Sequence, residues 1–405
     1  MIKVERSFPY IIATFALVLV IGFVFFQTSF AHEMKTRFSL TECRSVTNGQ
    51  EQIDCINRII EEEIIRGDIA DGMRVFKSAY SMFPPFANDC HNQAHRIGDF
   101  IYYKIYLNDK DISKIHFPSE TNGCKLGVFH GFFEHLFQDN PNPLFVTEIC
   151  ENFKQSPIEG VNPAVMGYTC YNGSGHGFQL AFAAEVPEAM WGNPKALVQK
   201  PLQYCERLRY INEHVTETDK ETCIEGIFSY IISWMKSGEY GLSYDNKDPF
   251  SLCHTLNQDR RSSCYRGMLP GPTSTPAVSP EVITRLLEPI GDKDVRLWLF
   301  EVSISNNVSN TVGAKINTDG KNWYKETLAE CEPFDAELYN RCMSGIVRGI
   351  LAHVKPEEEY SSVRMLCEEP TVVQRGAEDK CRQSVQYWMD YLYTPQEVLS
   401  IKEKA

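Results

Sequence analysis

Hydrophobic residues recur at steps of three and four along almost all of the chain that follows its N-terminal segment. In IDCINRIIEEEIIRG the isoleucines fall at such steps: Ile53, Ile56, Ile59, Ile60 and Ile64. This spacing is typical of an α-helix with one apolar face. The segments 219–235, 336–354 and 379–393 repeat it. Short connections rich in Pro, Gly, Asn and Asp separate such segments, and we find no run that alternates as a strand does. The pattern therefore predicts an all-α fold.

The first apolar segment differs from the others because it contains no charged residue. Phe8–Phe26 spans nineteen residues, close to the ~20 that a helix needs to cross a bilayer. Lys3 and Arg6 precede it and favour a cytoplasmic N-terminus. We therefore predict a single-pass transmembrane anchor, with the bulk of the chain exported. A cleaved signal peptide is the alternative, since Ser29 and Ala31 are small residues at the positions that a signal peptidase reads.

A cysteine motif recurs along the predicted helices. The spacing C-x-x-G occurs at the expected start of five of them: Cys124–Gly127, Cys170–Gly173, Cys223–Gly226, Cys264–Gly267 and Cys342–Gly345. Cys55, Cys90 and Cys381 are expected to open similar helices without the glycine. Glycine destabilises a helix interior by about 1 kcal/mol relative to alanine. Its recurrence therefore indicates positions where a neighbouring helix approaches closely.

The chain has fourteen cysteines, and none belongs to a C-x-x-C pair of the kind that wraps a zinc ion. An even number of widely spaced cysteines in an exported chain predicts disulfide bonds and an extracytoplasmic location. The simplest pairing joins each helix-opening cysteine to the one upstream: Cys150 to Cys170, Cys205 to Cys223, Cys253 to Cys264, Cys331 to Cys342, and Cys367 to Cys381. Each bridge would then connect one helix to the next.

These features together predict helical-hairpin repeats, connected by disulfides and arranged as a solenoid or an α/α-toroid. Leu269–Pro280 contains four prolines, which do not fit a helix interior. The predicted divisions are an N-terminal anchor or signal sequence at 1–31, a helical repeat lobe at 32–268, a proline-rich linker at 269–280 and a second helical lobe at 281–405.

The balance of charge excludes one class of partner. The formal net charge is −13, and the sequence has no block of five or more Lys and Arg residues. Nucleic-acid backbones are bound by clustered positive charge, so no nucleic-acid partner is expected.

His130 and His176 stand at the same place in two adjacent repeats, six residues after the cysteine, in the frame C-x-x-G-x-x-H-G. The other repeats carry different residues there: Ser229, Pro270, Arg348 and Tyr387. A residue required by the scaffold would recur in every repeat. The histidine is therefore expected to serve a local site.

The preceding repeat adds two more histidines. His91 and His95 are four residues apart and share one helical face, and His130 and Glu134 have the same spacing. His135 points roughly 100° away from that face and is left out of the set. Stacked repeats would bring five residues together: His91, His95, His130, Glu134 and His176.

Imidazole nitrogens and a carboxylate are ligands that zinc, iron, copper and manganese accept. We therefore predict a divalent-metal site with His95, His130, Glu134 and His176 as ligands and His91 as an auxiliary ligand. Zinc is the first choice. If the site is catalytic, the hypothesis is metal-assisted hydrolysis, with bound water as the nucleophile and Glu134 as ligand or general base. The competing interpretation is structural, with histidines that hydrogen-bond carbonyls where helices cross.

Two other functions stay open at this point. A non-catalytic extracytoplasmic scaffold would bind a protein partner on a concave helical face. A metal carrier or sensor would hold its ligands near the surface. In each case the N-terminal helix would attach the protein to a membrane. A catalytic site requires an open coordination position, whereas a scaffold predicts histidines that are buried and hydrogen-bonded.

Overall fold

The computed structural model describes residues 40–155, 161–211, 214–270, 278–315, 324–352 and 355–405. It is 80% helical, and the described residues contain no strand. Their only isolated β-bridge joins Val161 to Tyr393. The all-α prediction is confirmed.

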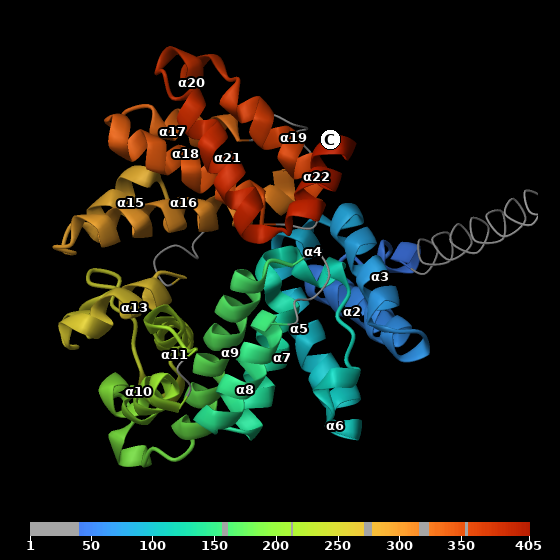
Figure 1. The fold of residues 1–405 in the computed structure, drawn as a ribbon, viewed down its shortest axis with the longest axis vertical. Helices are drawn as coiled ribbons and strands as arrows, with labels where there is room; N and C mark the ends of the chain where they lie inside the picture. Colours follow the sequence, from blue (N-terminus) through green and yellow to red (C-terminus); the bar gives the residue numbers. More distant parts are fainter. Residues whose placement is uncertain (1–39, 156–160, 212–213, 271–277, 316–323, 353–354) are drawn as a thin grey trace, which may run out of the picture. The chain divides into compact units, whose positions relative to one another are not determined.

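The helices follow one another with short connections (Figure 1). Those before the proline-rich segment are α2 (Gly49–Arg66), α3 (Ile69–Met82), α4 (Pro84–Asn88), α5 (Cys90–Ile101), α6 (Leu107–Asp109), α7 (Gly123–Asp139), α8 (Pro143–Gln155), α9 (Pro163–Ala183), α10 (Pro194–Ile211), α11 (Glu217–Ser237), α12 (Ser251–His254) and α13 (Gln258–Met268). Those after it are α15 (Pro280–Leu287), α16 (Lys293–Lys315), α17 (Lys325–Cys331), α18 (Ala336–Ile350), α19 (Pro356–Cys367), α20 (Pro370–Gln374), α21 (Glu378–Leu392) and α22 (Pro395–Lys404).

Five shorter helical segments lie between these helices. One is a π-helix at Tyr102–Tyr106, which continues α5. The others are 3-10 turns: Ile112–Lys114, Ser119–Asn122, Glu188–Met190 and Glu239–Gly241.

The chain divides into two compact units, one ending at Ala79 and one beginning at Tyr80. In the first unit, the Asn48 side chain accepts hydrogen bonds from the first turn of α2, and a disulfide joins Cys43 to Cys55. The division into lobes at 269–280 stays a prediction, and residues 271–277 lie outside the described part of the chain.

Two runs of sequentially packed helices form most of the second unit. Helix α5 packs on α7, α7 on α9, α9 on α11, and α11 on α13. Figure 1 shows α5, α7 and α9 side by side. In the second run α16 packs on α18, and α18 on α21. The two runs also touch, because α13 and α4 contact α16, and α21 contacts α9.

The glycines of the C-x-x-G motif lie where consecutive helices come closest. A Cβ atom on Gly226 would be 2.1 Å from the carbonyl oxygen of Asn172 on the preceding helix. The corresponding distance at Gly267 is 2.3 Å, to the Glu225 carbonyl oxygen. Real Cβ atoms essentially never come this close, so only glycine allows these helix spacings. The predicted packing role of the motif is confirmed at these positions.

All fourteen cysteines form disulfides, and the five predicted bridges are confirmed. The other two join Cys43 to Cys55 and Cys90 to Cys124. Such a set of bridges is typical of an extracytoplasmic or secreted protein.

The expectation that the motif cysteines open their helices is wrong for most of the repeats. Cys170 and Cys223 lie inside α9 and α11, because capping residues start these helices earlier. The Asn162 side chain accepts the Ala164 N–H at the start of α9, and Thr216 forms a capping box at the start of α11.

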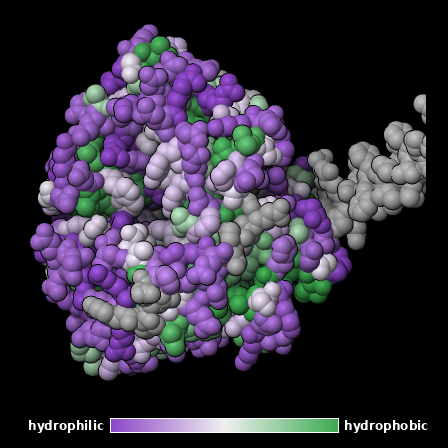
Figure 2. Space-filling model, viewed as in Figure 1, coloured by the Kyte–Doolittle hydropathy of each residue, from purple (hydrophilic) through white to green (hydrophobic). Residues whose placement is uncertain are grey.

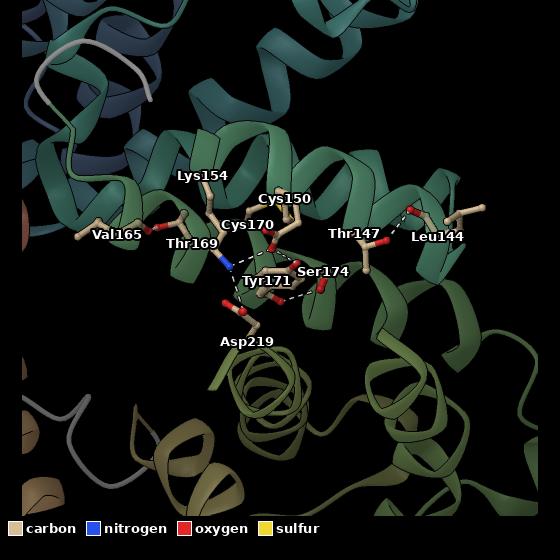
Figure 3. The surroundings of a disulfide bond; sticks show 11 residues. Leu144, Thr147, Cys150, Lys154, Val165, Thr169, Cys170, Tyr171, Ser174 and Asp219 are labelled. Atoms are coloured by element: carbon tan, nitrogen blue, oxygen red, sulfur yellow. Dashed lines mark hydrogen bonds and ion pairs between the residues drawn. A yellow bond between two sulfur atoms is a disulfide. The ribbon is translucent and has the colours of Figure 1, made fainter. Parts of the chain in front are cut away.

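The bridge between α8 and α9 shows how a disulfide works with polar contacts (Figure 3). Cys150 of α8 is bonded to Cys170 of α9. Beside it, Lys154 Nζ lies 2.9 Å from Glu151 Oε1 and 3.0 Å from Asp219 Oδ2, at the first turn of α11. Helices α8, α9 and α11 are thus held by one covalent bond and one half-buried ion-pair network.

The predicted N-terminal anchor lies in residues 1–39, outside the described part of the chain. Among the described helices, none combines the length and apolar character needed to cross a bilayer.

Exposed apolar side chains of the described residues are scattered over the surface. On the face shown in Figure 2, hydrophobic residues form small groups among hydrophilic ones. The exposed large hydrophobic residues come from many different elements: Ile65, Tyr103, Leu144, Met190, Trp191, Val373, Tyr387 and Leu399.

Candidate metal centre

The five predicted site residues lie on three consecutive helices of the first run. His91 and His95 are on α5, His130 and Glu134 on α7, and His176 on α9. Polar side chains inside this stack would ordinarily be kept apart by the bulk of the helices. Here the helices approach so closely that side chains from all three reach one another.

The glycine in each histidine–glycine pair explains this close approach. A Cβ atom on Gly131 would lie 2.1 Å from the carbonyl oxygen of His95, and one on Gly177 would lie 2.8 Å from that of Glu134. Each glycine therefore contacts the backbone of a site residue on the preceding helix. In each H-G pair, the histidine supplies the functional side chain, and the glycine beside it allows the neighbouring helix to come close enough for contact.

Three of the five residues form a compact donor set. One ligand atom from each of His95, Glu134 and His176 lies within 4.8 Å of the other two. Glu134 Oε2 is 3.1 Å from His95 Nε2 and 3.4 Å from His176 Nδ1. Two donors bound tetrahedrally at zinc distances are about 3.4 Å apart. A candidate metal-binding site is therefore present.

The other two histidines are next to this set. The ring centroids of His91 and His130 are 5.4 Å apart, and those of His130 and His176 are 6.0 Å apart. His91 Nδ1 lies 2.9 Å from the carbonyl oxygen of Cys124 and donates to it. This contact is the structural role that the competing interpretation predicted, and it leaves His91 Nε2 unprotonated when the ring is neutral.

Several buried polar atoms of the site have no hydrogen-bond partner among the described residues. They are His130 Nε2, Glu134 Oε2, and both ring nitrogens of His176. Glu134 Oε2 is within ion-pair distance of two imidazoles, but no hydrogen bond to it is well aligned. Leaving a buried polar group unsatisfied costs about 1–3 kcal/mol, and natural structures leave few such groups. Four together indicate that these atoms are arranged for a ligand.

A second layer of residues orients the donor set, and the sequence did not identify it. Asp99 Oδ1 lies 3.5 Å from His95 Nδ1 and 3.3 Å from His135 Nε2. The Tyr230 hydroxyl of α11 donates to Glu134 Oε1. Carboxylates behind metal-binding histidines fix the ring and its tautomer. The four-residue spacing from His95 to Asp99 was a usable signal, whereas nothing in the sequence indicated Tyr230.

The surroundings of each group determine its protonation. Burial opposes ionisation of Glu134, but its contacts with His176 and His95 outweigh burial and lower the pKa of the carboxyl. Burial also works against a charged His95, yet Asp99 and Glu134 raise its pKa. Burial lowers the pKa of His91 to about 3 and lowers that of His130. Near neutral pH Glu134 is therefore ionised and His91 and His130 are neutral, whereas His95 is the protonated partner of Glu134, so a metal ion that binds there must displace its proton.

This donor set suits some metals better than others. Two imidazoles and one carboxylate occur in catalytic zinc sites and in non-haem iron sites. Calcium and magnesium prefer all-oxygen ligands. The donors present fit the predicted transition metals, and the identity of the metal stays a prediction.

Comparisons with protein-family models, with curated proteins and with solved structures found no match for this chain. The function is therefore inferred from the chemistry of the site.

Proposed function

We propose that the chain binds a divalent transition metal through His95, Glu134 and His176, with zinc as the first choice and iron, copper or manganese as alternatives. The observation that carries this proposal is the donor set within 4.8 Å, surrounded by buried polar atoms that lack hydrogen bonds. His130 and His91 are auxiliary, because their rings adjoin the set without joining it.

The proposed activity is metal-assisted hydrolysis. A bound divalent ion supplies an activated water and polarises the bond to be cleaved. Glu134 acts as a ligand through Oε2, because Tyr230 holds Oε1 by a hydrogen bond. His130 Nε2 has no hydrogen-bond partner among the described residues, so it is available to accept a proton. Asp99 keeps the His95 ring in place.

The proposed architecture is a single array of helical hairpins that closes into an α/α-toroid. Two observations support it. Consecutive motif helices pack on one another, and α21 and α16 of the second run contact α9 and α4 of the first. The histidines would then lie on helices that face the interior of the array.

The proposed location is extracytoplasmic, with a single-pass anchor at Phe8–Phe26. The seven disulfides support an oxidising compartment, and the length of the apolar segment supports an anchor. A protein partner on a concave helical face is the alternative function. The His91 hydrogen bond to Cys124 favours it, because it shows one histidine in a packing role.

Metal content tests the proposal directly. The full chain should be produced in an oxidising compartment without a polyhistidine tag, extracted in mild detergent, and analysed by mass spectrometry. We expect near-stoichiometric metal, which Glu134→Gln and His176→Ala lose while helical content is unchanged. His254→Ala is the matched control, because His254 lies on α12, away from the donor set.

Two results would overturn the proposal. One is a wild type that stays metal-free after incubation with zinc, iron, copper and manganese. The other is metal that the Glu134→Gln variant retains in full. In either case the histidines are packing residues, and the search turns to protein partners.

A further inference from the structure

Arg348 occupies the position in its repeat that His130 and His176 occupy in theirs. It follows Cys342 by six residues, as each histidine follows its cysteine. Its guanidinium lies over the Trp388 ring, 4.5 Å from the ring centroid. No carboxylate of the described residues forms an ion pair with it. The aromatic ring stabilises the positive charge through its face and does not use the N–H groups of the guanidinium. These N–H groups therefore stay available to bind an anion.

Lys125 is close to Arg348 and is held by an unusual backbone. Cys124, Lys125 and Leu126 have φ values of 53°, 56° and 61°, so three consecutive non-glycine residues are left-handed. Left-handed helical turns cost roughly 1–2 kcal/mol per residue. Such conformations persist where surrounding structure enforces them, and they cluster at functional sites.

The contacts of this turn direct Lys125 towards the second run of helices. The Lys125 N–H donates to the carbonyl oxygen of Ala352, one turn beyond Arg348, at 3.2 Å. Lys125 Nζ lies 3.3 Å from Asn306 Oδ1 on α16. No carboxylate of the described residues pairs with Lys125 either. The strained turn therefore brings a second unpaired cation next to Arg348.

Two enclosed cations repel each other unless an anion lies between them. Burial and the charge of Arg348 lower the pKa of Lys125 to about 8. Glu225 interacts electrostatically with Arg348, but it also accepts from the Tyr168 hydroxyl at 2.7 Å and lies 3.3 Å from Arg266 Nε. Its charge is thus shared with Arg266, and no carboxylate of the described residues forms an ion pair with Lys125 or Arg348.

The pair lies on the side of the interior where the metal centre is. Lys125 directly follows Cys124, whose carbonyl oxygen accepts from His91 Nδ1 at 2.9 Å, and the His91 ring lies 5.4 Å from that of His130. Trp388, under the Arg348 guanidinium, is on α21, which contacts α9, the helix that carries His176. The cations and the donor set therefore adjoin the same interior region of the second unit.

We propose that Lys125 and Arg348 form an anion-binding pair that holds a carboxylate or phosphate group of the substrate beside the metal centre. This inference rests on the proposed function, and it makes the substrate class anionic. The aromatic face of Trp388 fixes the guanidinium plane, and Asn306 holds the ammonium, so both donors are positioned before the anion arrives.

Calorimetric titration of the full chain with inorganic phosphate, and separately with acetate, tests the pair. Each titration is run on metal-loaded and on chelator-treated protein. We expect binding by at least one anion, weakened at least tenfold in Lys125→Met and in Arg348→Met. The two anions separate a phosphate substrate from a carboxylate substrate. Lys125→Gln and Arg348→Gln replace any methionine variant that loses helical content.

The control is Arg364→Met. Arg364 lines a separate pocket of about 170 Å³ with Arg382, Tyr360 and Gln386, which is another place where an anion can bind. Anion affinity that falls in Arg364→Met but not in the Lys125 and Arg348 variants overturns the proposal. So does metal-loaded protein that binds neither anion at millimolar concentration.

The two proposals fail separately. A protein that takes up no metal but binds phosphate through Lys125 and Arg348 keeps the anion site and loses the metal centre. A protein that binds metal but no anion keeps the centre and loses the anion site.

Discussion

At the scale of single residues, Glu134 has contacts that no other described carboxylate combines. One oxygen faces two imidazoles, and the other accepts a hydrogen bond from Tyr230. It is 3% exposed, so water does little to compensate its charge. A buried carboxylate of this kind is stable only if its surroundings favour the ionised form, and here His95 and His176 do so.

Replacement of Asp99 tests the layer behind the ligands. Asp99→Asn removes the charge that faces His95 Nδ1 and is expected to weaken zinc affinity by about 10- to 100-fold. The measurement is a competition titration against a chromophoric chelator. Asp139→Asn is the control, because Asp139 accepts from Tyr102 and has no contact with the donor set among the described residues. Equal affinities for Asp99→Asn and wild type would remove Asp99 from the site.

At the scale of elements, the spacing between helices is determined by glycines rather than by large apolar side chains. In α9 the buried residues occur all round the helix, as expected for an element covered on every side. Its neighbours α7, α8, α10 and α11 all pack on it. A methyl group added at one of these glycines would therefore displace both the helix that carries it and the helix that it contacts.

Gly226→Ala is expected to destabilise the fold by about 1–3 kcal/mol, the usual range for overpacking. The added methyl group would overlap the Asn172 carbonyl oxygen and force α9 and α11 apart. Urea unfolding with intact disulfides, followed by circular dichroism, gives the change in the free energy of unfolding. Gly291→Ala is the matched control, since a Cβ atom there has no atom within 4 Å. Similar stabilities for the two variants would show that the helices yield easily at this contact.

At the scale of the whole molecule, each of the seven disulfides connects two segments that are close together in the sequence. They close loops of 11 to 34 residues. Bridges of this length stabilise mainly by restricting the unfolded chain. Their contribution to the metal centre depends on which helices they connect.

Two double variants separate these contributions. Cys90→Ser with Cys124→Ser removes the bridge between α5 and α7 and is expected to lower stability by about 2–5 kcal/mol and to weaken metal binding. Cys367→Ser with Cys381→Ser is expected to lower stability similarly but to leave metal affinity unchanged, because α19 and α21 carry no residue of the metal donor set. Thermal unfolding and metal titration of both variants provide the comparison. Equal metal affinities would show that the α5–α7 bridge is not needed at the site.

The sequence by itself determined the helical class and five of the seven disulfide pairs, and it predicted the export of the chain. Each of these follows from local information: the period of apolar residues, an uncharged segment, and the order of cysteines along the chain. It also identified the histidines, since their recurrence at one repeat position is visible without a structure. The helix starts were misplaced, because capping residues upstream of the motif decided them.

Only the tertiary structure decided which of these residues meet. His95, Glu134 and His176 come together because glycine contacts reduce the spacing between three helices, and His91 is diverted to the Cys124 carbonyl. Tyr230 is 96 residues from Glu134, which it contacts through the packing of the first run, and Lys125 and Arg348 are 223 residues apart. The proximity of Lys125 and Arg348 depends on how the two runs of helices contact each other. No local pattern encodes such contacts, because they depend on the packing of the whole second unit.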